Sequence, residues 1–261
     1  MTDNMHDKVI LEWPFSPPDF LETVIKEEGE GYQLVIDSGK AVATIHAEHF
    51  DTHPDIRSEL HSRIQKRLQG AQLVKHQRFE LEDSRLTRFA ADGRKTHFLE
   101  LKGTLYTTSV FPPDRQVRDA GGNVVVDTKQ ERIDEISSLG DSLIKFPGDM
   151  LLEGLLGIFG AAQNDPDNVL VRLYEIRDAL HKRFGNYKTM ESQLGIAEPQ
   201  INRFGKLCCD LPLLEGRHRG RSLGQLRPAT KAELKEAYDI AQAMIMGYLQ
   251  YLDKQSSNQQ S

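Results

Sequence analysis

The chain has 261 residues, of which 38% are hydrophobic and 28% are charged, and its formal net charge is -6 at pH 7. This composition is typical of a soluble globular protein with one large domain or two ordinary ones. The acidic balance argues against a general electrostatic attraction to nucleic acid, so any contact with phosphate must be local.

The cysteines and the apolar runs bear on where the protein works. Cys208 and Cys209 are the only cysteines, and because they are adjacent they form neither a disulfide framework nor a zinc site by themselves. The first eight residues are polar and lack the apolar core of a secretion signal. The most apolar run, 150–162, contains Glu153 and is shorter than the ~20 residues that span a bilayer. We therefore expect a cytoplasmic protein with no membrane segment.

Between residues 32 and 127 the sequence favours strands. Runs of β-forming residues flank the turn segments 37–40 and 92–95 and predict two hairpins, 32–36 with 41–45 and 86–91 with 96–101. β-Branched residues predict further strands at 104–110 and 124–127. One helix interrupts this set, with Asp55 as its cap and an apolar face formed by Ile56, Leu60, Ile64 and Leu68.

After about residue 130 the apolar period becomes helical. The pattern predicts helices at 133–143, 150–159, 170–184 (capped by Asn168 and ended by Gly185), 187–194 and 198–209. A capping box at Thr230–Glu233 begins a last helix of about 20 residues. We expect an α+β protein, with a small antiparallel sheet unit and one helix followed by an all-α bundle. The expected domains are 1–129, a β-rich sensor or partner-binding part, 130–253, a helical part, and 254–261, a flexible tail.

A dense group of cations, Arg217-His218-Arg219-Gly220-Arg221, lies between two helical segments of this acidic chain. Guanidinium groups bind phosphate or carboxylate through paired hydrogen bonds, and glycine lets backbone approach a ligand closely. Histidine carries a proton near neutral pH. We expect a phosphate-binding site formed by Arg217, Arg219, Arg221 and Arg227. The alternative is that these arginines bond helix carbonyls or acidic side chains.

The helical half resembles the HEPN superfamily in its order of helices and in the polar Arg/His loop before a long final helix. The matching segments are 173–180 and 215–220. HEPN domains are helical bundles, and many are metal-independent ribonucleases of toxin–antitoxin and phage-defence systems. The resemblance therefore implies a ribonuclease in which His218 is the general acid or base and Arg217 stabilises charge on the phosphate.

The chain departs from the HEPN pattern at one point. HEPN nucleases usually carry an arginine separated by four to six residues from the histidine that follows it. In this chain the residues at that distance before His218 are Leu211, Pro212 and Leu213. A member that binds RNA without cleaving it is therefore the alternative.

Residues 190–204 are similar to a helix-turn-helix, with the turn at Gly195. Leu194, Ile196 and Ile201 would pack its two helices together. In that interpretation the DNA-binding residues are Gln200, Asn202 and Arg203, and the arginine loop holds backbone phosphate. The protein would then be a DNA-binding regulator or an assembly subunit of a larger complex.

The spacing of acidic, basic and histidine residues also suggests two metal sites. Glu100 and Lys102 have the Glu-x-Lys spacing of magnesium-dependent nucleases, with Asp83 or Asp92 as the second carboxylate. Zinc could bind a cluster of residues formed by His46, His49 and His53 with Asp51 and Asp55. Both patterns are common on ordinary surfaces, so we expect neither a metal nor a cofactor.

The sequence thus favours a protein that binds RNA or a nucleotide through the 217–221 loop, and the sharper form of the hypothesis is a metal-independent ribonuclease. The wide apolar face of the last helix favours a homodimer through that helix. A protein partner is expected for the first domain by analogy alone.

Overall fold

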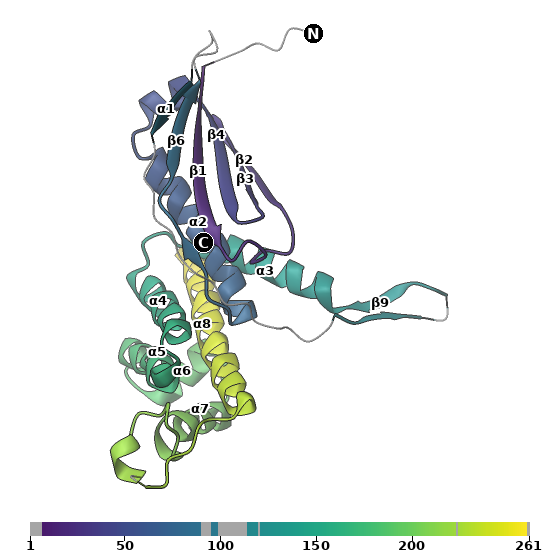
Figure 1. Ribbon diagram of the computed structural model, residues 1–261. Helices are drawn as coiled ribbons and strands as arrows, with labels where there is room; N and C mark the ends of the chain where they lie inside the picture. Colours follow the sequence, from purple (N-terminus) through teal and green to yellow (C-terminus); the bar gives the residue numbers. More distant parts are fainter. Residues whose placement is uncertain (1–6, 90–94, 99–113, 120, 223, 260–261) are drawn as a thin grey trace. The chain divides into compact units, whose positions relative to one another are not determined.

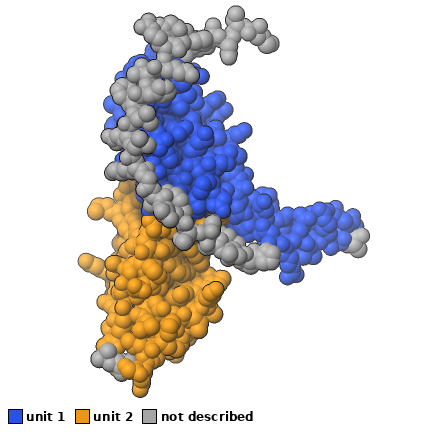
Figure 2. Space-filling view, viewed as in Figure 1, with its two compact units in different colours: residues 1–71, 79–144 blue, residues 72–78, 145–261 orange. Residues whose placement is uncertain are grey.

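The computed structural model describes residues 7–89, 95–98, 114–119, 121–222 and 224–259. The chain forms two compact units (Figure 2), one of residues 1–71 and 79–144 and one of residues 72–78 and 145–261. The first contains the strands and the second is helical, so the predicted α+β class is confirmed. From the sequence, the helix that follows residue 130 was expected to belong to the helical bundle. In the structure this helix makes its contacts with the sheet unit.

The first unit is built on an antiparallel sheet of order β2-β3-β4-β1-β6-β7, and β5 pairs with β1 off this path (Figure 1). Its strands are β1 (Lys8–Ser16), β2 (Ile25–Gly29), β3 (Tyr32–Asp37), β4 (Lys40–His46), β5 (Glu80–Leu81), β6 (Arg85–Phe89) and β7 (Lys95–Phe98). Two more strands, β8 (Gln116–Arg118) and β9 (Val124–Asp127), form a separate hairpin. β1 occupies the middle of the sheet because it pairs with β4 on one side and β6 on the other.

The first predicted hairpin is confirmed. Ser38 and Gly39 join β3 to β4 with φ angles of 46° and 83°. Two consecutive positive φ angles are characteristic of the turn whose twist matches that of the flanking strands. β6 and β7 also pair, as expected, with Leu86 opposite Phe98, and β9 lies where a strand was predicted. The turn 90–94 and the expected strand segments 99–101 and 104–110 lie outside the described residues.

Three helices belong to the first unit: α1 (Ala47–Thr52), α2 (Ile56–Lys75), of which residues 56–71 lie in this unit, and α3 (Thr128–Ile144). The predicted apolar face of α2 is buried and faces the alternating inward residues of the sheet, among them Val9, Leu11, Trp13, Leu34 and Ile36. Arg57 of α2 donates to Ser84 beside β6, and Arg67 pairs with Glu27 of β2 at 2.6 Å, so α2 crosses one face of the sheet. α3 packs on α2 where Gly70 meets Gly140.

The second unit consists of α4 (Met150–Asn164), η1 (Pro166–Asn168), α5 (Val169–Phe184), α6 (Tyr187–Leu194), α7 (Glu198–Gly205), the π-helical turn η2 (Lys206–Asp210), η3 (Arg219–Ser222) and α8 (Lys231–Gln259). The predicted helices are present, and α8 contacts α4, α5, α6 and α7. α6 and α8 approach closely because Gly247 of α8 leaves room for the backbone of Leu194. The last turn of α2 joins this unit, and the Gln72 side chain donates to Gln163 at 3.0 Å.

The long helix α8 begins where it was predicted to begin but continues further toward the C-terminus than expected. The capping box is confirmed, since the Thr230 hydroxyl accepts from the Glu233 N–H and the Glu233 carboxylate accepts from the Thr230 N–H. The helix continues to Gln259, whereas residues 254–261 were expected to be a flexible tail. Its apolar residues, including Ala241, Met244 and Ile245, are buried within the unit. The apolar face that favoured a homodimer thus has an intramolecular use, and dimerisation through α8 stays a prediction that gel filtration would test.

Among the helices that lie within the described residues, none combines the length and the apolar character needed to cross a bilayer.

Candidate phosphate-binding loop

The predicted phosphate-binding residues lie in a folded loop, 211–230, that joins η2 to α8. Backbone hydrogen bonds fix both arms of this loop: the Leu214 N–H donates to Arg227 at 3.0 Å and the Arg227 N–H donates to Pro212 at 2.9 Å. The Arg217 N–H donates to the carbonyl of Cys208 in η2 at 2.8 Å. Leu213 of the same loop is buried. These backbone bonds therefore hold both sides of the cationic segment in place.

Arg217 is engaged by an acidic side chain. Its Nη1 donates to Asp178 Oδ2 of α5 at 2.7 Å, and its guanidinium carbon lies 4.7 Å from the centre of the Tyr174 ring. The hydrogen bond that Arg217 donates to Asp178 raises the pKa of the guanidinium above its ordinary value. Both side chains of the pair remain more than 40% exposed, at 42% and 46%. Exposed pairs of this kind contribute only about 0–1 kcal/mol, so an incoming phosphate can replace the carboxylate.

Arg219 is held differently. Its Nε donates to the carbonyl of Gly216 at 2.8 Å and its Nη2 donates to the side-chain oxygen of Asn168. Both acceptors are uncharged, so they orient the guanidinium without neutralising it. Asn168 was expected to cap α5, but its side chain makes no capping bond because its oxygen accepts from Arg219 instead.

His218 and Arg221, the other two side chains of the segment that can carry charge, are at least partly exposed. Arg221 is exposed and His218 is partly exposed. Neither side chain has a hydrogen bond or an ion pair with any residue in the described part of the chain. The backbone between them is closed by a bond from the Arg221 N–H to the His218 carbonyl at 3.0 Å, which forms η3. These side chains are thus available to a ligand while their backbone is fixed.

Arg227, which was also expected to bind phosphate, is occupied elsewhere. Its two terminal nitrogens donate to the two oxygens of Glu233 at 2.8 and 2.7 Å. This pairing, together with the bonds from Thr230, lowers the pKa of Glu233 to about 2. Arg227 therefore fastens the loop to the first turn of α8, and we leave it out of the candidate site.

A cluster of aromatic and cationic side chains beside Arg217 was missed from the sequence. The guanidinium carbon of Arg177 lies 4.2 Å from the ring centre of Tyr174 and 5.1 Å from that of Tyr187. Arg177 also donates to the Tyr187 hydroxyl at 2.7 Å, and Tyr187 is 39% exposed. Burial raises the pKa of Tyr174 to about 12, so its phenol stays protonated at neutral pH. The three-residue spacing of Tyr174 and Arg177 on one helix was the available signal.

The residues of the helix-turn-helix interpretation have mostly structural contacts. Leu194, Ile196 and Ile201 are buried as expected, and Gly195 ends α6 with a φ of 67°. Arg203, however, donates to both oxygens of Glu236 at 2.9 and 2.7 Å. The side-chain oxygen of Gln200 accepts from the Ala197 N–H at 3.3 Å, and only Asn202 is both exposed and without a side-chain bond to the described residues.

The histidine cluster has a local arrangement. The rings of His49 and His53 stack with centres 3.9 Å apart, and His53 Nδ1 lies 3.0 Å from the carbonyl oxygen of His49. Within the ranges that the structure describes, no three His, Cys, Asp or Glu side chains are placed to hold a metal ion. Glu100, Lys102 and Asp92 of the magnesium motif lie outside the described residues.

No known protein family, curated protein or solved structure matches this chain. The candidate site therefore depends on its own geometry, and the HEPN likeness is confined to the order of helices and the Arg/His loop.

Proposed function

We propose that the helical unit binds a phosphate-bearing ligand, RNA or a nucleotide, through residues 217–221. One observation carries this proposal: Arg219 and Arg221 have no carboxylate partner among the described residues. A third cation, Arg217, lies next to them in an exposed ion pair that a phosphate can replace. A cytoplasmic setting, where RNA and nucleotides are available, belongs to the same proposal.

The state of Arg219 supports phosphate binding in particular. Fixing a long, flexible side chain on binding costs about 0.5–1.5 kcal/mol, and two neutral acceptors already hold this guanidinium in place. The cation is therefore oriented before the ligand arrives. Arg221 supplies a second cation, and His218 precedes both arginines in sequence.

The neighbouring aromatic cluster favours RNA over an isolated phosphate ion. Single-stranded nucleic acid is bound by cations along its backbone and by aromatic rings on which bases stack. The exposed Tyr187 ring is held by Arg177, and Arg177 and Arg217 flank the same Tyr174 ring. A base on Tyr187 and a phosphate on the loop would thus use one continuous surface of the helical unit.

The test is fluorescence anisotropy with a labelled single-stranded RNA of about 12 nucleotides at 50–200 mM salt. Each phosphate contact contributes about 0.7 to the slope of log affinity against log salt, so Arg219→Ala with Arg221→Ala should reduce that slope by about 1.4. Arg203→Ala is the matched control, since Arg203 belongs to the same unit but is paired with Glu236. A double variant that binds RNA with the affinity and salt slope of the unchanged protein would refute the proposal.

Whether the bound RNA is cleaved is a separate measurement. In the ribonuclease form of the proposal, His218 transfers a proton and Arg217 stabilises the phosphate charge. RNA incubated with the protein in chelator should then be cut, and His218→Ala should abolish cutting while leaving binding within a few-fold. Binding without any cleavage would leave phosphate binding standing and exclude catalysis.

A further inference from the structure

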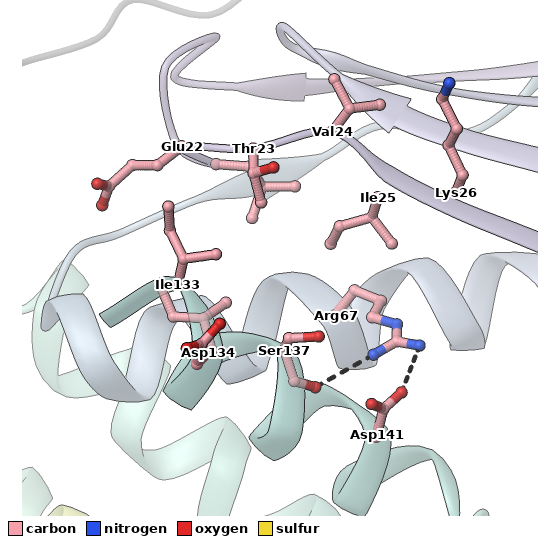
Figure 3. A pocket seen from close by; sticks show the side chains of 12 residues that line it. Glu22, Thr23, Val24, Ile25, Lys26, Arg67, Ile133, Asp134, Ser137 and Asp141 are labelled. Carbon is pink, nitrogen blue, oxygen red and sulfur yellow. Dashed lines mark hydrogen bonds and ion pairs between the residues drawn. The ribbon is translucent and has the colours of Figure 1, made fainter. Parts of the chain in front are cut away.

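The sheet unit contains a cavity of about 430 Å³ between the segment 21–26 and helix α3 (Figure 3). Arg67 of α2 lies at its floor between Ser137 and Asp141 of α3. Leu21, Ile133 and Ile136 supply apolar lining. We call this cavity, with the free edge of β2 beside it, the β2 groove.

One wall of the β2 groove is the edge of a sheet. Among the strands that the structure describes, β2 lies at the end of the order and pairs only with β3. The two strands are joined by a two-residue loop, with Gly29 opposite Tyr32. In such a hairpin the pair next to the loop exchanges hydrogen bonds, and bonded pairs then alternate along the strands. Gly29, Glu27 and Ile25 therefore bond to β3, and the backbone of Lys26 and Glu28 faces outward.

These outward groups are free among the residues that the structure describes. Lys26 and Glu28 have no backbone partner there beyond the β2–β3 pair, and their side chains are exposed. Val24, which precedes the strand, is 42% exposed although it lines the cavity. An edge strand beside an open cavity is the arrangement by which an extended peptide adds to a sheet and places alternate side chains in a pocket.

The charge around the β2 groove selects the kind of peptide. Three acidic residues line it, Glu22, Asp134 and Asp141, against two cations, Lys26 and Arg67. Glu22 is already paired with Arg132 at 2.6 Å, so the acidic groups that bear on a ligand are those of α3. Arg67 is buried and already neutralised, because it pairs with Glu27 and with Asp141 at 2.6 Å each. On the α3 wall, Asp134 is exposed, and its one bonded neighbour among the described residues is the uncharged Gln130. Asp141 remains 59% exposed.

We propose that the β2 groove binds an extended, basic segment of a partner protein, which adds to β2 as a further strand. Its backbone pairs with the outward groups of Lys26 and Glu28. Its apolar side chains enter the cavity beside Ile133 and Ile136, and its lysines or arginines meet Asp134 and Asp141. This proposal is independent of the phosphate-binding loop.

The probe is a fluorescein-labelled peptide of nine residues that alternates lysine and valine, measured by anisotropy with the full chain. Lys26→Pro removes an outward N–H, and proline is tolerated on an edge strand where that N–H bonds nothing. We expect Lys26→Pro to bind the peptide about tenfold more weakly than Lys26→Ala, because both variants lose the lysine charge and only the proline variant also loses the N–H. Asp134→Lys should weaken binding through charge.

The decisive comparison uses the unchanged protein, so it does not depend on how a variant folds. A peptide of the same sequence and charge that is N-methylated at every residue has no N–H left on either edge and cannot form the added strand. We expect it to bind at least tenfold more weakly than the unmethylated peptide. Equal binding of the two peptides, or equal binding of the Lys26→Pro and Lys26→Ala variants, would overturn the proposal in favour of simple charge attraction.

Discussion

Replacing Gly247 by alanine tests how α6 packs on α8. A Cβ at this position would lie 2.5 Å from the carbonyl oxygen of Leu194 and 3.0 Å from its Cβ. The first of these atoms is backbone, so α6 itself must move to relieve the overlap. Overpacking costs about 1–3 kcal/mol, and the better helix propensity of alanine returns up to about 1 kcal/mol. We expect a net loss of about 1–2 kcal/mol in the free energy of unfolding.

The chain supplies a matched control for this change. Gly154 lies on an exposed side of α4, and a Cβ there would meet nothing within 4 Å. Gly154→Ala should therefore stabilise the helix by about 0.5–1 kcal/mol through propensity alone. Urea unfolding followed by circular dichroism at 222 nm would compare the variants. If Gly247→Ala is as stable as Gly154→Ala, the close packing of α6 on α8 is wrong.

Two further predictions concern charged and titrating groups. Arg67→Ala leaves the buried Glu27 carboxylate with less compensating charge and should lower the free energy of unfolding by about 3–5 kcal/mol. Arg88→Ala breaks an exposed pair with Asp51 and should lower it by at most about 1 kcal/mol. Urea unfolding followed by Trp13 fluorescence compares the two variants, and equal losses would contradict the burial of the Arg67–Glu27 pair. Burial lowers the pKa of His76 from 6.5, so the unfolded chain binds that proton more tightly and stability falls as the pH drops below about 6.5. The urea midpoint should decrease between pH 7.5 and 5. His76→Asn should make this decrease smaller, and asparagine suits the positive φ of 49° at this position. If the variant shows the same dependence of the urea midpoint on pH, the role of His76 is refuted.

Local signals in the sequence predicted the elements that short-range chemistry decides. Ser38–Gly39 predicted a hairpin because few residues adopt two positive φ angles, and the Thr230–Glu233 box predicted the start of α8. β1 was missed although Val9, Leu11, Trp13 and Phe15 alternate with less buried residues, because Glu12 and Pro14 interrupt the apolar pattern. β2 was missed for a different reason: an edge strand needs few apolar residues, and IKEEG has one.

The candidate site was predictable as a cluster of cations but not as a set of contacts. Arg217 and Asp178 are 39 residues apart and Arg219 and Asn168 are 51 apart, so their pairing depends on the packing of the bundle. Sequence reasoning could not separate Arg227, which Glu233 occupies, from Arg221, which has no such neighbour among the described residues. The sequence could not assign α3 to the sheet unit for the same reason, because this assignment depends on a contact between residues far apart in sequence, Gly70 and Gly140.

The central position of β1 has a consequence for the order in which the sheet is completed. β1 leaves the ribosome before the other described strands of its sheet, yet it is the strand that joins β4 to β6. Its neighbour β4 follows within a short stretch of chain, but its other neighbour, β6, is made only after α2 has been synthesised. Throughout that interval of translation one side of β1 is without its partner, and a chain that starts after residue 16 would leave β2-β3-β4 and β6-β7 as two fragments with no strand in common.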